Sequence, residues 1–342
     1  MARFEFMTRS VFQYHPTYGF HFIPGVKARI PHESGGYLVR ANAAGFRSDR
    51  DFVAARTTGL RRVLLFGDSY TAGDGVSNGA RYSDLLETHI PNLEVYNYGL
   101  PGTGTDQHYL VYRDVAPRIE HDLIVIAVLV ENIRRVVAHY RLFENADGKR
   151  VALAKPYFAL DERDALVLHN VPVPPREISL DELPAHEREH VDQGGDLSLV
   201  RRAVNFLGPG VKSVLQSAFG QNPLPAYDSP DDPAWRLLRA ILARWIAEAS
   251  VPVVVVPLPL YHYVEDIADP SAYRARFTEL ARASGAQLHD PLSDLMALPP
   301  EQRRALRFER DVHPTPFAHE QLARSIAARI QPLLATQAAV HA

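Results

Sequence analysis

Apolar runs recur along the chain from residue 62 onward, and amphipathic stretches separate them. Prominent runs cover 123–130 and 251–260, a shorter one covers 63–66, and a further strand is indicated at 93–99. Runs rich in Val, Ile and Leu that end at Gly, Pro or polar residues are typical of strands buried on both faces of a parallel sheet. A short further strand is expected at 287–289. The pattern therefore predicts about five parallel strands.

Apolar residues at helical spacing occur between these runs. Residues 82–90 place apolar side chains on one face, and another helix is expected from Asp106. A helix before the fourth run has Asp232 as a suitable N-cap and Pro233 at its first position. The last helix is expected to open at Pro316. Strands that alternate with helices need right-handed crossovers, so we predict an α/β fold with a flavodoxin-like doubly wound parallel sheet.

Two regions depart from this alternation. Residues 1–60 are rich in aromatic and turn residues and predict short strands and loops, an N-terminal extension that packs on a main domain at 61–335. The second region, at about 140–230, indicates an inserted hairpin and helical subdomain, with the hairpin in 155–176 and the helix in 197–207. Such an insertion suits a lid or specificity subdomain, and a structural decoration fits the same pattern.

Composition narrows the class of protein. The 342 residues are 46% apolar and 23% charged, as in globular proteins, and a net charge of −3 gives no reason to expect a nucleic-acid partner. The absence of cysteine excludes disulfides, thiolate metal sites and a cysteine nucleophile. The first residues lack the apolar core of a secretory signal, and no stretch reaches the ~18 apolar residues of a membrane span. We expect a cytoplasmic protein, and the sequence leaves its oligomeric state open.

The first strand ends at Gly67-Asp68-Ser69, where polar residues take over. Ser69 is thus expected just beyond the carboxyl end of a strand, the edge at which open α/β sheets bind ligands. The segment GDSYTAGDG lacks the Gly-Lys-Ser/Thr ending of a phosphate-binding P-loop. It also lacks the second glycine of the G-x-S-x-G nucleophile elbow. From this segment alone, a polar turn and a nucleophilic serine are both consistent.

Other strand ends carry groups that a nucleophilic serine requires. A serine hydroxyl needs a base, for which His313 is the candidate, and Asp311 is the candidate acceptor that fixes the histidine tautomer. The amides of Ser69 and Gly102 and the side chain of Asn132 are candidate donors to an oxyanion. Taken singly, Gly102 and Asn132 are more often turn or cap residues. Their occurrence together, in the order one acyl-transfer site requires, favours catalysis.

A metal site is the competing use of the same histidine and acidic residues. His289 and Asp290, together with Asp311 and His313, offer ligand types, but no metal-ligand spacing such as HExxH occurs. We therefore expect no metal site.

The segments together resemble the GDSL-type SGNH hydrolases, in their bacterial form with an N-terminal extension. The resemblance covers roughly residues 60–135 and 250–330, and its matching blocks are 67–70, 97–102, 130–132 and 311–314. It implies a flavodoxin-like sheet and no cofactor. It also implies Ser69 as nucleophile, Gly102 and Asn132 in the oxyanion hole, and His313 as base.

Two departures from the family pattern concern the site. The third block usually reads Gly-x-Asn-Asp, whereas Glu131 precedes the asparagine here and Ile133 follows it. The last block more often has Asp three residues before His, a position that Arg310 occupies in this sequence. Asp311, two residues before the histidine, resembles a variant spacing and is taken as the orienting acid.

The leading interpretation is a serine esterase that hydrolyses a short-chain O-acyl ester, with a sugar-linked ester favoured, through an acyl-enzyme on Ser69. An O-acyltransferase would use the same residues, and a catalytically silent binding module would keep only the fold. The expected partner is a small-molecule or glycan acyl ester. Asp68 is expected to support the nucleophile, and Arg47 and Tyr70 are predicted to contact the substrate.

Overall fold

A five-stranded parallel sheet forms the centre of the computed structural model, which describes residues 11–144, 149–185, 187–188 and 222–340. Its strands lie in the order β6-β5-β7-β13-β14, and each adjacent pair is parallel. Their bounds are β5 (Arg61–Phe66), β6 (Leu93–Asn97), β7 (Leu123–Leu129), β13 (Val253–Leu258) and β14 (Gln287–Leu288). The predicted flavodoxin-like α/β fold is therefore confirmed.

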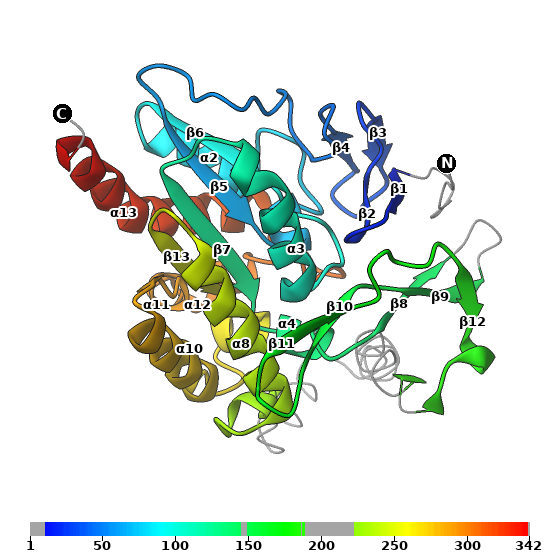
Figure 1. Ribbon diagram of the computed structural model, residues 1–342. Helices are drawn as coiled ribbons and strands as arrows, with labels where there is room; N and C mark the ends of the chain where they lie inside the picture. The colour runs from blue at the N-terminus through cyan, green and yellow to red at the C-terminus, as the bar shows by residue number, and fades with distance from the viewer. Residues whose placement is uncertain (1–10, 145–148, 186, 189–221, 341–342) are drawn as a thin grey trace.

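Burial on both faces explains why the apolar runs form strands. Every residue of β7 and of β13 is buried, so neither strand shows a polar face. Helix α2 (Tyr82–His89) contacts α13 (Pro316–Val340), while α3 (Thr105–Val115) contacts α8 (Pro233–Glu248), which in turn contacts α10 (Ser271–Ser284). Figure 1 shows α3 and α8 in front of the sheet. Helices thus cover the sheet, as the predicted crossovers require.

The helix boundaries agree closely with the predicted ones. Asp232 caps α8, because its side chain accepts hydrogen bonds from the backbone N–H groups of Ala234 and Trp235. Helix α3 begins at Thr105, one residue before the position expected. Short helices connect the larger elements: α1 (Ser69–Ala72), η1 (Ala116–Arg118), α4 (Asn132–Arg135), η2 (Leu180–Glu182), η3 (Pro225–Tyr227), α9 (Tyr261–Val264), α11 (Leu292–Met296) and α12 (Pro300–Arg304).

Two antiparallel hairpins precede the parallel sheet, in agreement with the predicted short strands. They pair β1 (Phe12–His15) with β2 (Gly19–Phe22), and β3 (Lys27–Ile30) with β4 (Tyr37–Arg40). Phe22 and Phe46 are buried in the same apolar cluster as Phe66 of β5. The N-terminal segment therefore shares the core of the sheet.

The insertion contains more strands than the sequence indicated. The predicted hairpin is confirmed as β10 (Tyr157–Leu160) paired with β11 (Leu166–His169). A second sheet of β8 (Tyr140–Glu144), β9 (Arg150–Ala154) and β12 (Glu177–Ser179) was not expected. Figure 1 places these strands beside the N-terminal hairpins, at the side of the molecule toward which β7 runs. The helix expected at 197–207 lies outside the described residues.

The strand order determines where a ligand site is expected. The order in which strands are added to the sheet reverses between β5 and β7. Strand β6 is added on one side of β5, whereas β7, β13 and β14 are added on the other side. Loops diverge at such a switch point and leave a crevice beyond the carboxyl ends of the strands. Ser69 follows β5 and Asn132 follows β7. Both residues therefore lie at the switch point.

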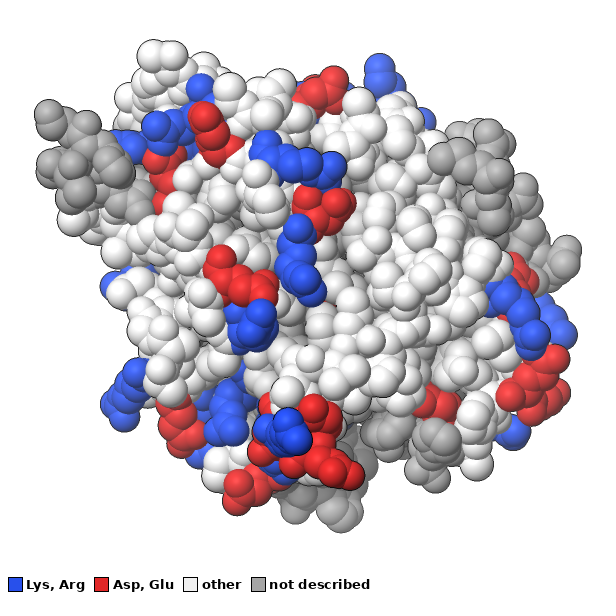
Figure 2. Space-filling view, viewed as in Figure 1, with Lys and Arg blue, Asp and Glu red and all other residues white. Residues whose placement is uncertain are grey.

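The described surface adds two observations. Figure 2 shows Lys and Arg interspersed with Asp and Glu over the face in view, around a broad uncharged area. Within the described ranges, no helix combines the length and apolar character that crossing a bilayer requires.

Candidate active site

The turn after β5 presents Ser69 at the sheet edge. Gly67 has no room for a side chain, because an added Cβ would lie 2.1 Å from Oγ1 of Thr71 and 2.9 Å from the Ala127 carbonyl. This close approach lets the chain turn directly from strand into helix α1. The carboxylate of Asp68 accepts the Tyr70 N–H at 3.1 Å and caps that helix. Ser69 is the first residue of α1 and keeps 5% of its surface exposed.

A hydrogen-bond chain joins Ser69 to residues near the other end of the sequence. Oγ of Ser69 lies 2.8 Å from Nε2 of His313, and Nδ1 of His313 lies 2.6 Å from Oδ1 of Asp311. An ionised carboxylate only accepts hydrogen bonds, so Nδ1 carries the proton and Nε2 is left to accept the serine hydroxyl. The arrangement is that of a Ser-His-Asp triad. Arg310, at the commoner spacing, has no acceptor to offer the histidine.

Residues of the N-terminal segment hold the acid from its other side. Nε2 of His32 lies 3.2 Å from Oδ2 of Asp311. The Ser34 backbone N–H donates to Nδ1 of His32 at 3.2 Å, so the proton of a neutral His32 sits on Nε2 and points at the carboxylate. Glu33 accepts the backbone N–H of Asp311 at 2.7 Å. Sequence analysis missed both His32 and Glu33, because no local pattern links them to a loop so distant in the chain.

Electrostatics favour the charged state of the acid–base pair. Burial acts to raise the pKa of Asp311, but the hydrogen bonds and positive charge of His313, together with the hydrogen bond from His32, outweigh burial and hold that pKa well below the usual range. For His313, burial acts to lower the pKa, whereas the Asp311 hydrogen bond and the charges of Asp74, Asp311 and Asp68 outweigh it and raise the pKa above 6.5. The site is thus suited to stabilising an imidazolium.

The expected oxyanion donors Gly102 and Asn132 follow β6 and β7, the two strands that flank β5. Asn132 opens α4 and is fully buried, yet neither polar atom of its side-chain amide has a partner among the described residues. Buried amides are normally paired, so an unpaired one at a strand end indicates a group reserved for a ligand. Gly102 adopts φ +74°, a conformation that favours glycine. Its role and that of Asn132 stay predictions.

Asp68 also connects the nucleophile to the asparagine. Its Oδ2 accepts a hydrogen bond from Nη1 of Arg135 at 2.8 Å. Arg135 is the last residue of α4, the short helix that begins at Asn132. Burial raises the pKa of Asp68, and the positive charge of Arg135 opposes that shift. Glu131 faces Arg135 at 3.9 Å. The unusual third block is therefore held by an arginine that sequence analysis missed.

Arg47 does not contact the cleft, and that prediction is wrong. Its side chain is fully buried, and its guanidinium donates to the carbonyls of Ala72 at 2.9 Å and Leu38 at 3.0 Å, and also to that of Gly73. Burial lowers its pKa to about 10. Arg47 fastens the turn after α1 to the N-terminal segment, so every donor direction is used inside the protein.

Tyr70 lies against His313. Its hydroxyl donates to the Val312 carbonyl at 2.9 Å, and its ring centroid lies 5.5 Å from that of His313. Tyr70 also lines an apolar pocket whose other residues are Leu258, Pro259, Tyr261, Val264, Leu295, Arg303, Leu306, Arg307, Val312, Pro314, Ala318 and Leu322. Substrate contact by Tyr70 stays a prediction.

The residues considered for a metal site are engaged elsewhere. Nε2 of His289 lies 2.8 Å from Oγ of Ser325, and Asp290 accepts Nε of Arg274 at 2.6 Å. Across the described ranges, no group of three His, Asp or Glu side chains gathers as metal ligands do.

A doubly wound sheet with a Ser-His-Asp arrangement at its switch point defines a serine hydrolase of the α/β class. The chain belongs to the GDSL-like lipase/acylhydrolase family, whose family model matches residues 65–321. The match confirms the family inferred from the four blocks. The protein is accordingly a hydrolase that acts on ester bonds.

The solved structures to which this chain is similar are distant in sequence. A lipolytic protein of the G-D-S-L family from Veillonella parvula DSM 2008 is 12% identical, with 79% of this chain and 97% of that chain covered and a TM-score of 0.40. The lipase/acylhydrolase from Enterococcus faecalis is 15% identical, with 80% of this chain and 96% of that chain covered and a TM-score of 0.40. Axe2, an acetylxylan esterase from Geobacillus stearothermophilus, is 14% identical, with 80% of this chain and 96% of that chain covered and a TM-score of 0.41. Among curated proteins, no sequence matches this chain.

Proposed function

We propose that the protein is a serine esterase that cleaves short-chain O-acyl esters through an acyl-enzyme on Ser69. The observation that carries the proposal is the continuous hydrogen-bond chain from Ser69 through His313 to Asp311. An unpaired, fully buried amide on Asn132 lies at the end of the neighbouring strand. A binding module would need neither a base beside a hydroxyl nor an unsatisfied donor near it.

The chemistry follows from these positions. Nε2 of His313 takes the proton as Oγ of Ser69 attacks the ester carbonyl, and Asp311 stabilises the imidazolium. The Ser69 and Gly102 amides and the Asn132 amide group receive the negative charge on the carbonyl oxygen. The imidazolium then protonates the departing alkoxide, which leaves the acyl group on Ser69. Water, deprotonated by His313, attacks the acyl-enzyme and releases the acid.

Active-site labelling tests the proposal directly. A fluorophosphonate should label the wild-type protein at Ser69 and should not label Ser69→Ala, which should retain its circular dichroism spectrum. A panel of p-nitrophenyl acetate, butyrate and octanoate, followed by acetylated sugars, then identifies the acyl chain and the alcohol. Absence of labelling and of turnover in the folded wild-type protein would leave the binding module as the surviving alternative.

The oxyanion hole provides a quantitative test of the same mechanism. We predict that Asn132→Ala lowers kcat by roughly 10²- to 10³-fold, because one preorganised donor to the oxyanion is lost. The KM should change much less, since the donor acts mainly in the transition state. Steady-state kinetics with one p-nitrophenyl ester measure both constants. A change confined to KM would assign Asn132 to substrate binding instead.

A sugar-linked substrate and acyl transfer are the finer parts of the proposal. The aromatic side chains of Tyr14, Phe20 and Phe143 line a hollow next to polar groups, a combination suited to sugar rings. The apolar pocket at Tyr70 suits a short acyl chain. An insertion that excluded water from the site would favour an acceptor hydroxyl over water as the group that resolves the acyl-enzyme. Product analysis with and without a sugar acceptor separates the esterase from the acyltransferase.

A further inference from the structure

Arg141 places a positive charge beside the predicted oxyanion hole. It lies on β8 of the insertion and is half-buried. A Cβ added to Gly102 would lie 2.6 Å from Nη2 of Arg141, 2.8 Å from its Nε and 2.9 Å from its Cζ. Since the whole guanidinium group approaches this one point, it lies closely against the Gly102 backbone. The insertion thus reaches the catalytic edge of the sheet through an arginine.

The other charged groups around Arg141 have partners. Arg135 binds Asp68, and Lys155 binds Asp106. Asp68 and Glu131 are the acids whose charge reaches Arg141, and both already face Arg135. Within the described part of the chain, the guanidinium of Arg141 itself makes no hydrogen bond and no ion pair. Each of these acids is therefore already in contact with a cation other than Arg141.

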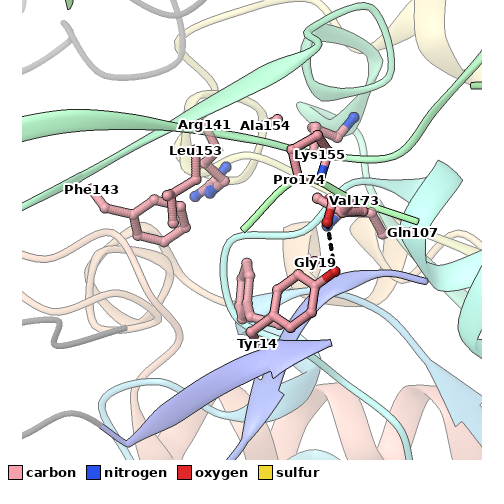
Figure 3. A pocket seen from close by; sticks show the side chains of 11 residues that line it. Tyr14, Gly19, Gln107, Arg141, Phe143, Leu153, Ala154, Lys155, Val173 and Pro174 are labelled. Atoms are coloured by element: carbon pink, nitrogen blue, oxygen red, sulfur yellow. Dashed lines mark hydrogen bonds between the residues drawn. The ribbon is translucent and has the colours of Figure 1, made fainter. Parts of the chain in front are cut away.

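The guanidinium faces a hollow with few free polar groups of its own. The hollow is small and partly open to solvent, and its other lining residues are Tyr14, Gly19, Phe20, Gln107, Phe143, Leu153, Ala154, Lys155, Val173 and Pro174. Figure 3 shows Arg141 reaching from its strand between Phe143 and Pro174, with the Tyr14 hydroxyl bound to the Val173 carbonyl. Gln107 donates to the Tyr18 carbonyl at 2.8 Å. Arg141 is therefore the charged group left available to a ligand in this part of the described structure.

We propose that Arg141 binds an anionic group of the substrate, so that the preferred substrate is an acyl ester carrying a carboxylate, phosphate or sulfate. The inference rests on the esterase function proposed above and names its substrate class. A planar guanidinium offers paired donors that match the two oxygens of such a group. A partly buried cation without a counter-charge is costly, and a substrate anion removes that cost.

The ionisation of Arg141 agrees with this geometry. Burial, together with the positive charge of Arg135, lowers the pKa of Arg141 to about 9. The side chain therefore remains charged at neutral pH, although no anion among the described residues is in direct contact with it. A bound anion would raise that pKa again.

Matched ester pairs test the proposal in the full-length protein. The first pair, 4-acetoxybenzoate and 4-acetoxybenzamide, differs by one negative charge in the alcohol part. The second pair, mono-4-nitrophenyl adipate and its primary amide, differs by one negative charge in the acyl part. The kcat/KM ratio of anionic to neutral ester is measured within each pair for the wild type and for Arg141→Gln. Taking the ratio within a pair cancels effects of the substitution on the chemistry common to both esters.

A charge-assisted contact predicts that, in at least one pair, Arg141→Gln lowers this ratio roughly ten- to hundredfold. Arg141→Lys keeps the charge without the paired donors and should lose less. Arg310→Gln removes a positive charge from an exposed position beside the triad and should leave both ratios unchanged. If Arg141→Gln does not fold, the smaller loss in Arg141→Lys still tests the contact.

Equal loss of activity toward anionic and neutral esters would overturn the proposal and make Arg141 a support of the oxyanion hole. Unchanged ratios in both pairs would overturn it as well. Failure of the esterase function looks different, because neither pair would then be hydrolysed and a fluorophosphonate would not label Ser69.

Discussion

At the scale of single residues, the site combines groups that would be unfavourable elsewhere. A buried amide without partners, such as that of Asn132, costs about 1–3 kcal/mol of folding free energy. Gly102 adopts a positive φ, and an arginine occupies the space its side chain would need. Such groups persist where a reaction needs donors that are already in place. Packing alone gives no reason to keep such groups, so their unfavourable contribution to folding supports a functional role for this site.

Asp311 is the candidate orienting acid, although the commoner family spacing would place that acid at the position of Arg310. We predict that Asp311→Asn lowers kcat substantially, because an amide can hold His313 in the unproductive tautomer. Arg310→Ala should keep most of the activity, since a guanidinium cannot accept the histidine N–H. The turnover numbers of both variants with one ester at the pH optimum decide the matter. An Asp311→Asn enzyme within about threefold of the wild type would reduce the site to a Ser-His dyad.

The raised pKa of His313 predicts the pH dependence of the reaction. The base must be neutral, so kcat/KM should fall as the pH drops through a value above 6.5. Asp74 favours the protonated form, together with Asp311 and Asp68. Asp74→Asn should therefore move the acid limb of the profile to lower pH, whereas the exposed substitution Asp231→Asn should leave it in place. An acid limb at the wild-type pH in Asp74→Asn would mean that the charge of Asp74 does not raise the pKa of His313.

At the scale of elements, one buried ion pair holds the insertion on the parallel sheet. Nζ of Lys155, between β9 and β10, binds the carboxylate of Asp106 in α3 and donates to the carbonyls of Arg135 at 2.9 Å and Ala138 at 3.0 Å. Burial lowers the pKa of Lys155, and burial raises that of Asp106. Both charges therefore depend on each other.

Removing one partner of this pair should destabilise the protein strongly. We predict that Asp106→Asn lowers the free energy of unfolding by roughly 3–5 kcal/mol, because the Lys155 ammonium stays buried without its counter-charge. The double variant Asp106→Asn with Lys155→Met should recover a large part of that loss. Urea unfolding followed by circular dichroism measures each value. A single variant as stable as the wild type would show that the pair does not fasten the insertion.

At the scale of the whole molecule, the N-terminal segment completes the site. His32 and Asp311 lie 279 positions apart in the sequence, yet their side chains are hydrogen bonded. Glu33 binds the backbone N–H of Asp311 from the same loop. The acid is thus held between a loop of its own and one that precedes the parallel sheet. The division of the chain into an extension at 1–60 and a domain at 61–335 stays a prediction, and these contacts cross it.

This contact predicts a positioning role for His32. His32→Ala should lower kcat about tenfold with little change in KM, because Asp311 loses one of the donors that orient it. His32→Gln, whose amide N–H reaches a similar place, should recover part of the loss. His169→Ala, at an exposed position on β11, is the control and should behave as the wild type. Equal activity of His32→Ala and the wild type would mean that the loop around His313 orients Asp311 unaided.

The sequence predicted the elements whose signals are local. The strands β7 and β13 are apolar throughout, and β5 is apolar from Val63 onward, because helices cover both faces, and that burial is visible as an unbroken run. The three-stranded sheet of β8, β9 and β12 was missed, because strands of 3 to 5 residues with mixed burial lack such a run. Their pairing depends on contacts between distant segments, which no short pattern records.

By itself, the sequence determined the sheet, the family, and the places of Ser69, Gly102, Asn132 and His313 at strand ends and before the last helix. These follow from burial and from short motifs, which are properties of neighbouring residues. Only the tertiary structure decided that Asp311 lies within reach of His313 and that His32 supports it. The tertiary structure also shows that Arg47 is buried and that Arg141 lies against Gly102. Side-chain environments arise from segments far apart in the chain, so folding had to bring them together before their chemistry was defined.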